Sequence, residues 1–135
     1  MADCIFCRIA AGTAKAEVVH ETPAALAFLD AHPAARGHAM VIPRVHAASL
    51  LELEGAAVEG LFLAVKEVMA KVAAALRPAG MNVGWNHGRA AGQHVFHLHV
   101  HVLPRYAEGG RGVQLLGAGG DRGELAEVAA ALRRA

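Results

Sequence analysis

The sequence predicts an α+β fold, in which an antiparallel sheet of about five strands packs with one long helix and a C-terminal helix. Short apolar runs that are rich in β-branched residues and bounded by turn residues predict the strands. One stretch, residues 54–77, has helical periodicity instead. Because helices are too few to alternate with the strands, we expect neighbouring strands to pair antiparallel rather than to form βαβ units.

Length and composition predict one domain, residues 1–135, and limit the classes of partner. The chain has 135 residues, of which 55% are hydrophobic, which is enough for one core. The formal net charge is +1 and no basic stripe is interleaved with aromatic residues, so nucleic acid is not expected as a partner. Neither an apolar run of membrane-spanning length nor a signal-peptide pattern occurs, which predicts a cytoplasmic protein without membrane contact.

Three strands are predicted in the first half of the chain. Residues 17–20 and 25–29 are apolar runs joined by a turn at residues 21–23. A further strand, residues 38–42, follows a loop and is expected to stop at Pro43, which has no N–H for the ladder.

A long helix is predicted for residues 54–77, and Pro78 with Gly80 ends it. Residues 81–85 predict the next strand. The apolar side chains of the helix share one stripe, which indicates packing across a sheet: Val58, Leu61, Phe62, Val65, Val68, Met69, Val72 and Leu76.

A C-terminal helix is predicted for residues 122–134. Asp121 is expected to cap it, with Glu124 completing a capping box. The glycine-rich stretch 109–120 is expected to be a connection before this helix. Apolar side chains recur at helical spacing: Leu125, Val128 and Leu132.

Three histidines at every second position mark the candidate site. In a strand of residues 95–104, His97, His99 and His101 would point to one face. Imidazole is nucleophilic and exchanges protons near neutral pH, so three in a row indicate metal ligation or phosphate chemistry. The preceding loop, residues 86–93, would bring backbone N–H groups beside them. The opposite face would be buried: Phe96, Leu98, Val100 and Val102.

The residue pattern leaves three interpretations of this histidine face open. In the first, the imidazoles hold an open zinc site that activates water, although Asp30 is the only acidic residue expected nearby. In the second, the middle histidine, His99, attacks a phosphorus atom while its neighbours handle protons and charge. In the third, the histidines only face solvent, which is unusual because polar strand faces normally mix several residue types.

Cys4 and Cys7 form a C-x₂-C pair near the N-terminus. Two cysteines are too few for a disulfide scaffold, and in a reducing compartment this spacing indicates metal binding or redox chemistry. A structural zinc would need two further ligands, which the spacing does not identify. The other interpretation is a pair of reduced thiols.

The run of residues 97–103 resembles the His-φ-His-φ-His-φ-φ signature of the histidine-triad (HIT) family of nucleotide hydrolases and transferases. The resemblance implies a HIT-like fold. It covers roughly residues 3–106 and leaves the C-terminal loop and helix, 107–135, unassigned. Further segments are similar to family segments in the same order: residues 4–7, 26–30, 37–46 and 92–93.

Position by position, the resemblance implies roles for the site residues. His99 is similar to the family's nucleophile, which attacks the α-phosphorus and forms a nucleotidyl-histidine intermediate that water hydrolyses. His101 resembles the residue that contacts the phosphate or assists the leaving group, and His97 completes the catalytic set. Asp30 matches the acid that binds the ribose hydroxyls. The remaining implied nucleotide contacts are an apolar slot for the base and a loop around the phosphate: Ile5, Phe6, Ile9, Phe28 and Leu29 in the slot, and Asn86, Gly92, Gln93 and His94 in the loop, the last three through their backbone.

The N-terminal cysteine pair resembles the Hint-like, bacterial-type branch of the family. In relatives that carry such a pair, the matching ligands imply that His46 and His97 complete a zinc site with Cys4 and Cys7. Four protein ligands would close the coordination sphere, so this zinc is expected to be structural. The family also implies a homodimer.

The expected function is hydrolysis of nucleoside 5′-phosphoramidates or dinucleoside polyphosphates, releasing a nucleoside monophosphate, with a purine nucleotide and hence AMP as the default. The alternative is a nucleotide-binding regulatory protein with little catalysis. His94 departs from the family pattern, because many relatives have Ser or Thr there and use its hydroxyl at the leaving group. This departure leaves the choice between an amine and a phosphate leaving group open. His38 lies where the family often has a histidine near the site.

Overall fold

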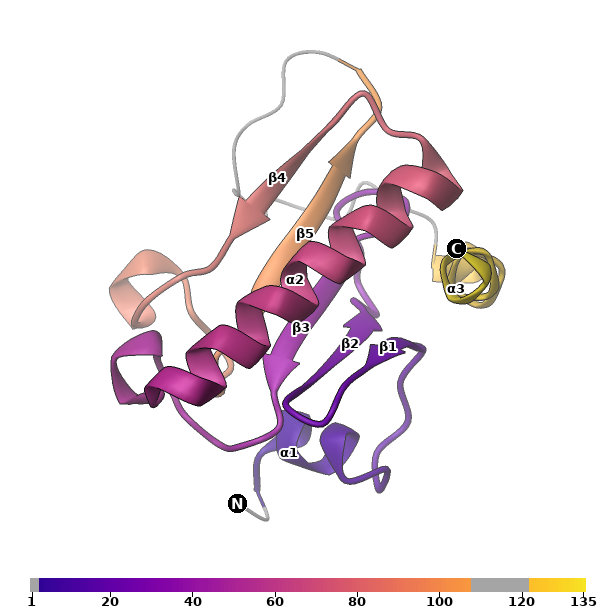
Figure 1. Ribbon diagram of the computed structural model, residues 1–135. Helices are drawn as coiled ribbons and strands as arrows, with labels where there is room; N and C mark the ends of the chain where they lie inside the picture. Colours follow the sequence, from indigo (N-terminus) through magenta and orange to yellow (C-terminus); the bar gives the residue numbers. More distant parts are fainter. Residues whose placement is uncertain (1–2, 108–121) are drawn as a thin grey trace.

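In the computed structural model, residues 3–107 and 122–135 are described, and five strands form one antiparallel sheet in the order β1-β2-β3-β5-β4 (Figure 1). This confirms the predicted α+β class. The strands are β1 (Val18–Glu21), β2 (Ala25–Leu29), β3 (Ala39–Pro43), β4 (Gly80–Gly84) and β5 (Val100–Arg105). The helices are α1 (Ile5–Ala10), α2 (Gly55–Leu76) and α3 (Leu125–Arg134), with 3₁₀ turns at Leu50–Glu52, Arg89–Ala91 and Arg122–Glu124.

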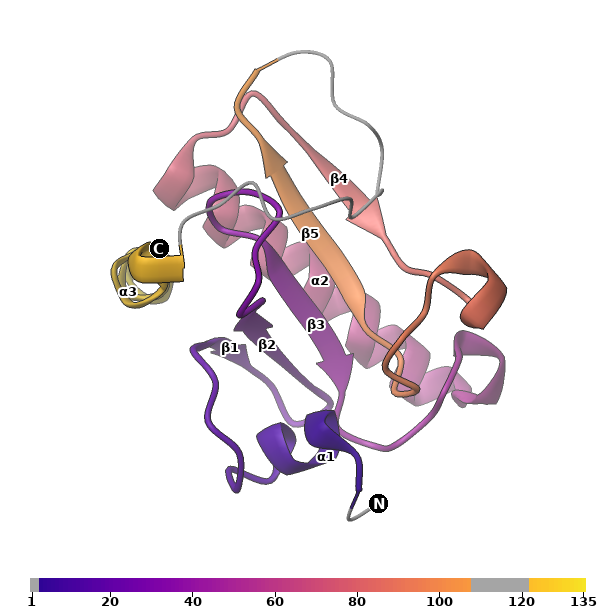
Figure 2. The same cartoon turned by 180° about the vertical axis from the view of Figure 1, so that it is seen from behind.

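The two faces of the sheet carry separate apolar clusters. On one face α2 crosses the strands, and its buried residues, such as Val68, pack against Val41 and Val100 (Figure 1). On the other face lies α1. Figure 2 shows the molecule from that side. There Phe6 and Ile9 pack in a second, smaller cluster with residues from β2 and β3: Leu26, Phe28, Met40 and Ile42. The sheet therefore buries both faces, and only the second one borders the candidate site.

The long helix matches the predicted range to within one residue at each end. Glu54 is its N-cap, and Arg77 ends it in the left-handed conformation with φ 48°. Pro78 follows, and it cannot continue the helix. Within the described residues, no helix is both long and apolar enough to span a membrane.

Replacing Gly60 with alanine is expected to destabilise the protein, although alanine favours helices. The added Cβ would lie 2.5 Å from the Cβ of Ala24, which forces α2 away from the turn between β1 and β2. Overpacking costs about 1–3 kcal/mol, against roughly 1 kcal/mol gained in helix propensity. Unfolding in urea measures the difference. Gly55→Ala is the matched control, since nothing lies within 4 Å of its added Cβ; equal stability of the two variants would contradict the prediction.

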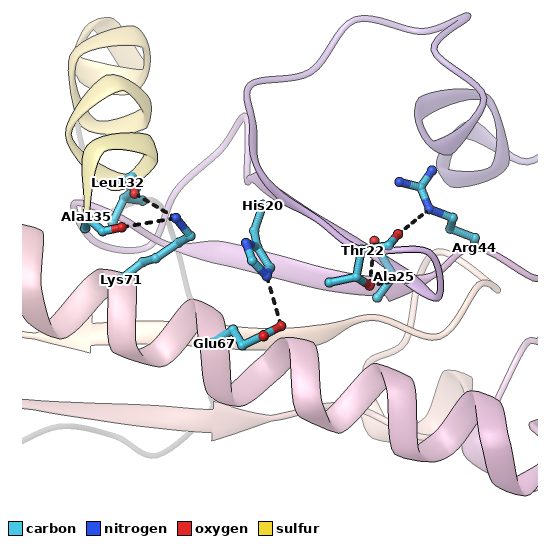
Figure 3. Close-up of polar contacts among 8 residues, drawn as sticks. All are labelled: His20, Thr22, Ala25, Arg44, Glu67, Lys71, Leu132 and Ala135. Carbon is cyan, nitrogen blue, oxygen red and sulfur yellow. Dashed lines mark hydrogen bonds and ion pairs between the residues drawn. The ribbon is translucent and has the colours of Figure 1, made fainter.

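The C-terminal helix packs against α2 and β1. Lys71 Nζ donates to the carbonyl oxygens of Leu132 and Ala135, at 3.5 and 3.3 Å, at the C-terminal end of α3 (Figure 3). In the same view His20 Nε2 lies 3.0 Å from Glu67 Oε1, which ties β1 to α2. The helix is shorter than predicted because residues 122–124 form a 3₁₀ turn. The proposed cap at residue 121 and the connection 109–120 lie outside the described residues.

The histidine strand is shorter than the sequence predicts. β5 begins at Val100, so His97 and His99 precede the strand instead of lying within it. The pairing of β3 with β5 stops at Val41 and Val100, and the N–H of Leu98 donates to Ala47 O at 2.7 Å, outside the sheet. Phe96, predicted to be buried, is 38% exposed. β2 matches the prediction, and β1, β3 and β4 are each shifted by one residue. β3 includes Pro43 as its last residue, whereas the strand was predicted to stop before it.

Candidate active site

The register of three strands brings one row of side chains to the second face of the sheet. Phe28 of β2 pairs with Met40 of β3, and Met40 pairs with His101 of β5. Paired residues of neighbouring strands point to the same face. His101 therefore faces the side of the sheet on which α1 lies.

A chain of hydrogen bonds sets the proton positions of His101. The backbone N–H of Ala34 donates to His38 Nδ1 at 3.1 Å, so the proton of the neutral His38 ring is on Nε2. That Nε2–H donates to His101 Nδ1 at 2.9 Å, which leaves the proton of His101 on its own Nε2. Burial lowers the pKa of His38 to about 4 and that of His101 to about 3, so both rings are neutral at pH 7.

His101 Nε2 is buried and has no hydrogen-bond partner among the described residues. A buried N–H without a partner costs about 1–3 kcal/mol, so such groups are rare and mark places where a ligand supplies the acceptor. The tautomer makes this atom a donor. It is therefore suited to an anionic oxygen or to a leaving group that needs a hydrogen bond.

Beside the donor N–H of His101, the His99 ring presents a nitrogen with a free lone pair. Its Nδ1 donates to His97 O at 2.8 Å, which leaves a lone pair on Nε2. Its ring lies 5.0 Å from the ring of His101 and 5.1 Å from that of Phe6, both edge-to-face. Burial lowers the pKa of His99, which favours the neutral, nucleophilic ring. A nucleophilic nitrogen and a donor N–H thus lie on adjacent imidazoles.

Replacing His38 with glutamine is expected to reduce the loss of stability in acid. Because the pKa of His38 is about 4 in the folded protein and about 6.5 for an unperturbed histidine in the unfolded chain, only the unfolded chain takes up this proton between those pH values. The free energy of unfolding then falls by about 1.4 kcal/mol per pH unit as the pH drops, and levels off below the folded pKa. Between pH 7 and 5 the wild type should lose about 2 kcal/mol more than His38→Gln in urea unfolding.

The substitution of His32, an exposed loop histidine, serves as the control. If His38→Gln and wild type had the same pH dependence, His38 would not be buried in the neutral form.

A cavity of about 330 Å³ lies over the second face of the sheet. It contains the residues that the family resemblance implies for the nucleotide base, and six more that the sequence did not identify. Leu29 lines its edge, although its side chain belongs to the core cluster under α2. The lining residues are Ile5, Phe6, Ile9, Lys15, Ala16, Glu17, Phe28, Leu29, Asp30, Ala31, Met40 and Leu125. Leu125 is notable because it brings the C-terminal helix to this cavity.

Asp30 joins the cavity to the histidines. It lines the cavity, and its Oδ2 lies 3.8 Å from His38 Nε2. Its Oδ1 accepts from the backbone N–H of His32 at 2.9 Å. The side chain is 22% exposed, so the carboxylate keeps acceptor positions that a ligand with hydroxyl groups can reach.

The loop before the histidines differs from the expected phosphate cradle. The N–H groups of Gly92 and Gln93 donate to Arg89 O and Gly88 O within the turn, so both are used. The buried Gln93 side chain accepts from Gly88 N–H and donates to the carbonyls of residues 48 and 95. Gln93 thus shapes the loop instead of facing the site. Asn86 does lie close to Gly92: its amide nitrogen would be 3.5 Å from a Cβ at that position, which is an ordinary contact. The φ of +102° is therefore what favours glycine there.

His94 lies apart from the cavity beneath α1. It is exposed and lines a second hollow with Asp3, Cys4, Ile5, His46, Val95 and Phe96. Arg89 covers the ring of Phe96 at 4.9 Å. The hollow is adjacent to the cavity, because Ile5 lines both.

Four residues from three separate parts of the chain form what we call the cysteine–histidine cluster: Cys4, Cys7, His46 and His97. Their ligand atoms all lie within 4.8 Å of one another. The Sγ atoms of Cys4 and Cys7 are each 3.5 Å from His97 Nδ1, and Cys7 Sγ is 3.3 Å from His46 Nδ1. Tetrahedral zinc, with bonds of about 2.3 Å to sulfur and 2.0–2.1 Å to nitrogen, places such atoms roughly 3.5 Å apart. The cluster therefore fits zinc.

The tautomer of His97 agrees with this assignment. Its Nε2 donates to Pro43 O at 2.8 Å, so the lone pair is on Nδ1 and points to the two sulfur atoms. A second group of possible ligands, Asp30, His38 and His101, does not pass the same test. There His38 Nε2 carries a proton that is donated to His101, so it has no lone pair for a metal.

The fold and the site define a class of α+β protein, in which a buried histidine pair lies near an apolar cavity and a cluster of two cysteines and two histidines. The model of the HIT domain matches residues 11–108, and the chain belongs to this family. It is 44% identical over 107 residues to an uncharacterized 16.1 kDa HIT-like protein of Mycoplasma pneumoniae, covering 79% of this chain and 74% of that protein.

Two further relatives have informative names. An adenosine 5′-monophosphoramidase of Schizosaccharomyces pombe is 42% identical over 102 residues, 76% of this chain and 74% of that protein. The crystal structure of a zinc-bound histidine triad family protein from Mycobacterium smegmatis superposes with a TM-score of 0.82 at 33% identity. The superposition covers 98% of this chain and 92% of that one, so it includes the C-terminal helix.

Proposed function

We propose that this protein is a nucleotide hydrolase that cleaves at the α-phosphate of nucleoside 5′-phosphoramidates or dinucleoside polyphosphates. The observation that carries the proposal is the pair of neighbouring imidazole nitrogens: a lone pair on His99 Nε2, and a buried N–H on His101 Nε2 that has no partner in the described part of the chain. Covalent phosphate chemistry needs both a nucleophile and a donor for the charge that develops. The phosphoramidase among the relatives supports the first substrate class.

In the proposed reaction His99 Nε2 attacks the α-phosphorus, and the bond from phosphorus to the leaving group breaks. His101 Nε2–H donates to an oxygen on the phosphorus or to the leaving atom, where charge builds up. Water then attacks the nucleotidyl-histidine, the P–N bond breaks, and the nucleoside monophosphate leaves. The carbonyl of His97 holds the proton on His99 Nδ1 throughout, which keeps Nε2 free for phosphorus.

The cavity is proposed to hold the nucleoside. Its apolar walls, which include Phe6 and Phe28, suit a purine base such as adenine. Asp30 would accept hydrogen bonds from the two ribose hydroxyls, since a carboxylate offers paired acceptors. Asn86, close to Gly92, is proposed to contact the phosphate. The backbone N–H groups of Gly92 and Gln93 have no part in the proposal, because the loop uses them.

The cysteine–histidine cluster is proposed to bind a structural zinc. Four protein ligands close the coordination sphere, so a zinc ion here supplies cross-linking of the N-terminal segment and not an activated water. Zinc hydrolysis, the rival reaction, would require an open position. It predicts that activity is lost with the metal even when the protein stays folded.

A homodimer is also proposed, through α2 and the edge strand β4. Leu63 on α2 is 59% exposed and Val83 on β4 is 36% exposed, and burying such side chains is favourable. Light scattering coupled to gel filtration should give twice the mass of the chain. A monomer at micromolar concentration would exclude this part of the proposal.

The deciding experiment measures AMP release from adenosine 5′-phosphoramidate and from a diadenosine polyphosphate in parallel. We expect release from at least one, and the faster substrate identifies the leaving-group class. If AMP binds but neither substrate turns over, the chain is a nucleotide-binding regulator. His94→Ser tests whether this position affects the choice, because the ratio of the two rates should then change.

A further inference from the structure

We propose that metal binding and nucleotide binding are coupled through α1, so that zinc in the cysteine–histidine cluster raises the affinity for the nucleotide. The same coupling makes bound nucleotide raise the affinity for zinc. This inference rests on the proposed function and adds a regulatory role for the cluster. The segment of α1 contributes residues both to the cysteine–histidine cluster and to the cavity.

Cluster residues and cavity residues alternate in this short segment. Cys4 and Cys7 contribute their sulfur atoms to the cluster. Ile5, Phe6 and Ile9, from the same helix, line the cavity proposed for the base. In this segment no more than one residue separates a cysteine ligand from the next residue that lines the cavity. A displacement of the cysteines therefore also displaces the cavity wall.

The helix is too short to keep its place without attachments. It has six residues, whereas isolated helices of fewer than about 12–15 residues are marginal in water. Phe6 and Ile9 pack in the small second apolar cluster, and Arg44 Nη1 donates to Ala10 O at 3.4 Å. The strongest attachment available is the cluster, because it would cross-link α1 to His46 and His97 by metal–ligand bonds.

Two contacts connect α1 and the cysteine–histidine cluster with His99. The ring of Phe6 packs edge-to-face on that of His99, with centroids 5.1 Å apart. The backbone carbonyl of His97, a residue of the cluster, accepts the Nδ1 hydrogen bond of His99. Loss of the metal should therefore loosen both the wall of the cavity and the proposed nucleophile.

Zinc and nucleotide are expected to favour each other's binding because each of them immobilises α1. In the metal-free protein the nucleotide must itself immobilise α1, and that cost reduces its affinity. When zinc has already fixed α1, the cost is absent and the nucleotide binds more tightly. Coupling between sites typically amounts to 5–150-fold. We expect the dissociation constant of AMP to rise at least about fivefold when zinc is removed.

The experiment is a closed binding cycle with the full chain. Calorimetry measures AMP affinity for the zinc-loaded and the zinc-stripped protein, and a competing chelator dye measures zinc affinity with and without AMP. We expect equal factors from the two arms. Equal AMP affinity of both forms would overturn the coupling and leave the proposed function intact. If neither form bound AMP, the proposed function would fail and the coupling with it.

Two variants locate the coupling in α1. Phe6→Leu removes the ring contact with His99 but keeps an apolar side chain, so zinc affinity without AMP should stay within about twofold while the coupling factor decreases. Arg8→Ala, at an exposed position of the same helix, should keep the full factor. If both variants kept the wild-type factor, the route through Phe6 would be wrong.

Amide hydrogen exchange separates local loosening from unfolding. Removing zinc should speed exchange in residues 5–10 while β3 and β5 keep their protection. Loss of protection throughout the sheet would show that zinc acts on global stability, and would overturn a coupling specific to α1.

Discussion

Replacing His99 with alanine is expected to lower AMP release by roughly 10³-fold or more while AMP still binds, because covalent catalysis fails without its nucleophile. The reason lies in the geometry of the ring. Its Nδ1 is held by His97 O at 2.8 Å, so only Nε2 is free to attack phosphorus. No other described residue presents a neutral imidazole lone pair beside the unpartnered N–H of His101.

The measurement pairs steady-state AMP release with AMP binding for wild type and His99→Ala. His87→Ala, at an exposed loop position, is the control for histidine loss and should behave as wild type. A trapped nucleotidyl adduct, seen by mass spectrometry of the quenched wild type, should be missing from His99→Ala. Near-normal turnover of the variant would exclude a nucleotidyl-His99 intermediate.

Replacing Cys4 with serine should cost the zinc-loaded protein on the order of several kcal/mol of stability, since structural zinc contributes about 10–16 kcal/mol of binding free energy in small zinc domains. The same substitution should be harmless in the metal-free protein. There Cys4 Sγ accepts the N–H of Cys7 at 3.4 Å at the start of α1 and lies 3.5 Å from His97 Nδ1. A serine hydroxyl can make both hydrogen bonds, and serine is a preferred residue at the start of a helix.

The contrast between the two states is the test. Urea unfolding of wild type and Cys4→Ser, each with excess zinc and with chelator, gives four free energies of unfolding. We expect a large difference with zinc and a difference close to zero, or in favour of serine, without it. An equal loss in both states would mean that the thiol acts by packing, and the assignment of Cys4 as a zinc ligand would be wrong.

Local periodicity predicted the elements that depend on local patterns. The apolar stripe of residues 54–77 gives α2 almost residue for residue, because its signal repeats over six turns. The alternating histidines gave the right face for His101 but the wrong strand length. Alternation continues through residues 95–99, whereas a strand also needs a partner, and β3 offers none to His97 or His99.

The site was accessible only in part from the sequence. The cysteine–histidine cluster joins residues 93 positions apart, Cys4 and His97, and no spacing rule connects them. It was the family resemblance that supplied His46. The link from His38 to His101 spans 63 positions and depends on burial, which composition does not reveal. The resemblance implied a phosphate contact through the backbone of Gln93, whereas its N–H donates to Gly88 O. Its buried side chain bonds to backbone groups of residues 48, 88 and 95, which the sequence did not indicate.

The peptide N–H of Ala34 has a consequence for which substitutions position 34 of this chain tolerates. By donating to His38 it decides which nitrogen of His38, and then which nitrogen of His101, is protonated, although the methyl group of Ala34 takes no part. Position 34 can therefore accept many side chains without chemical effect. Proline is the exception, because it removes the N–H and releases two buried rings to exchange donor for acceptor at the candidate site. The chemical state of the candidate site thus depends on a main-chain group at position 34 and not on the side chain there.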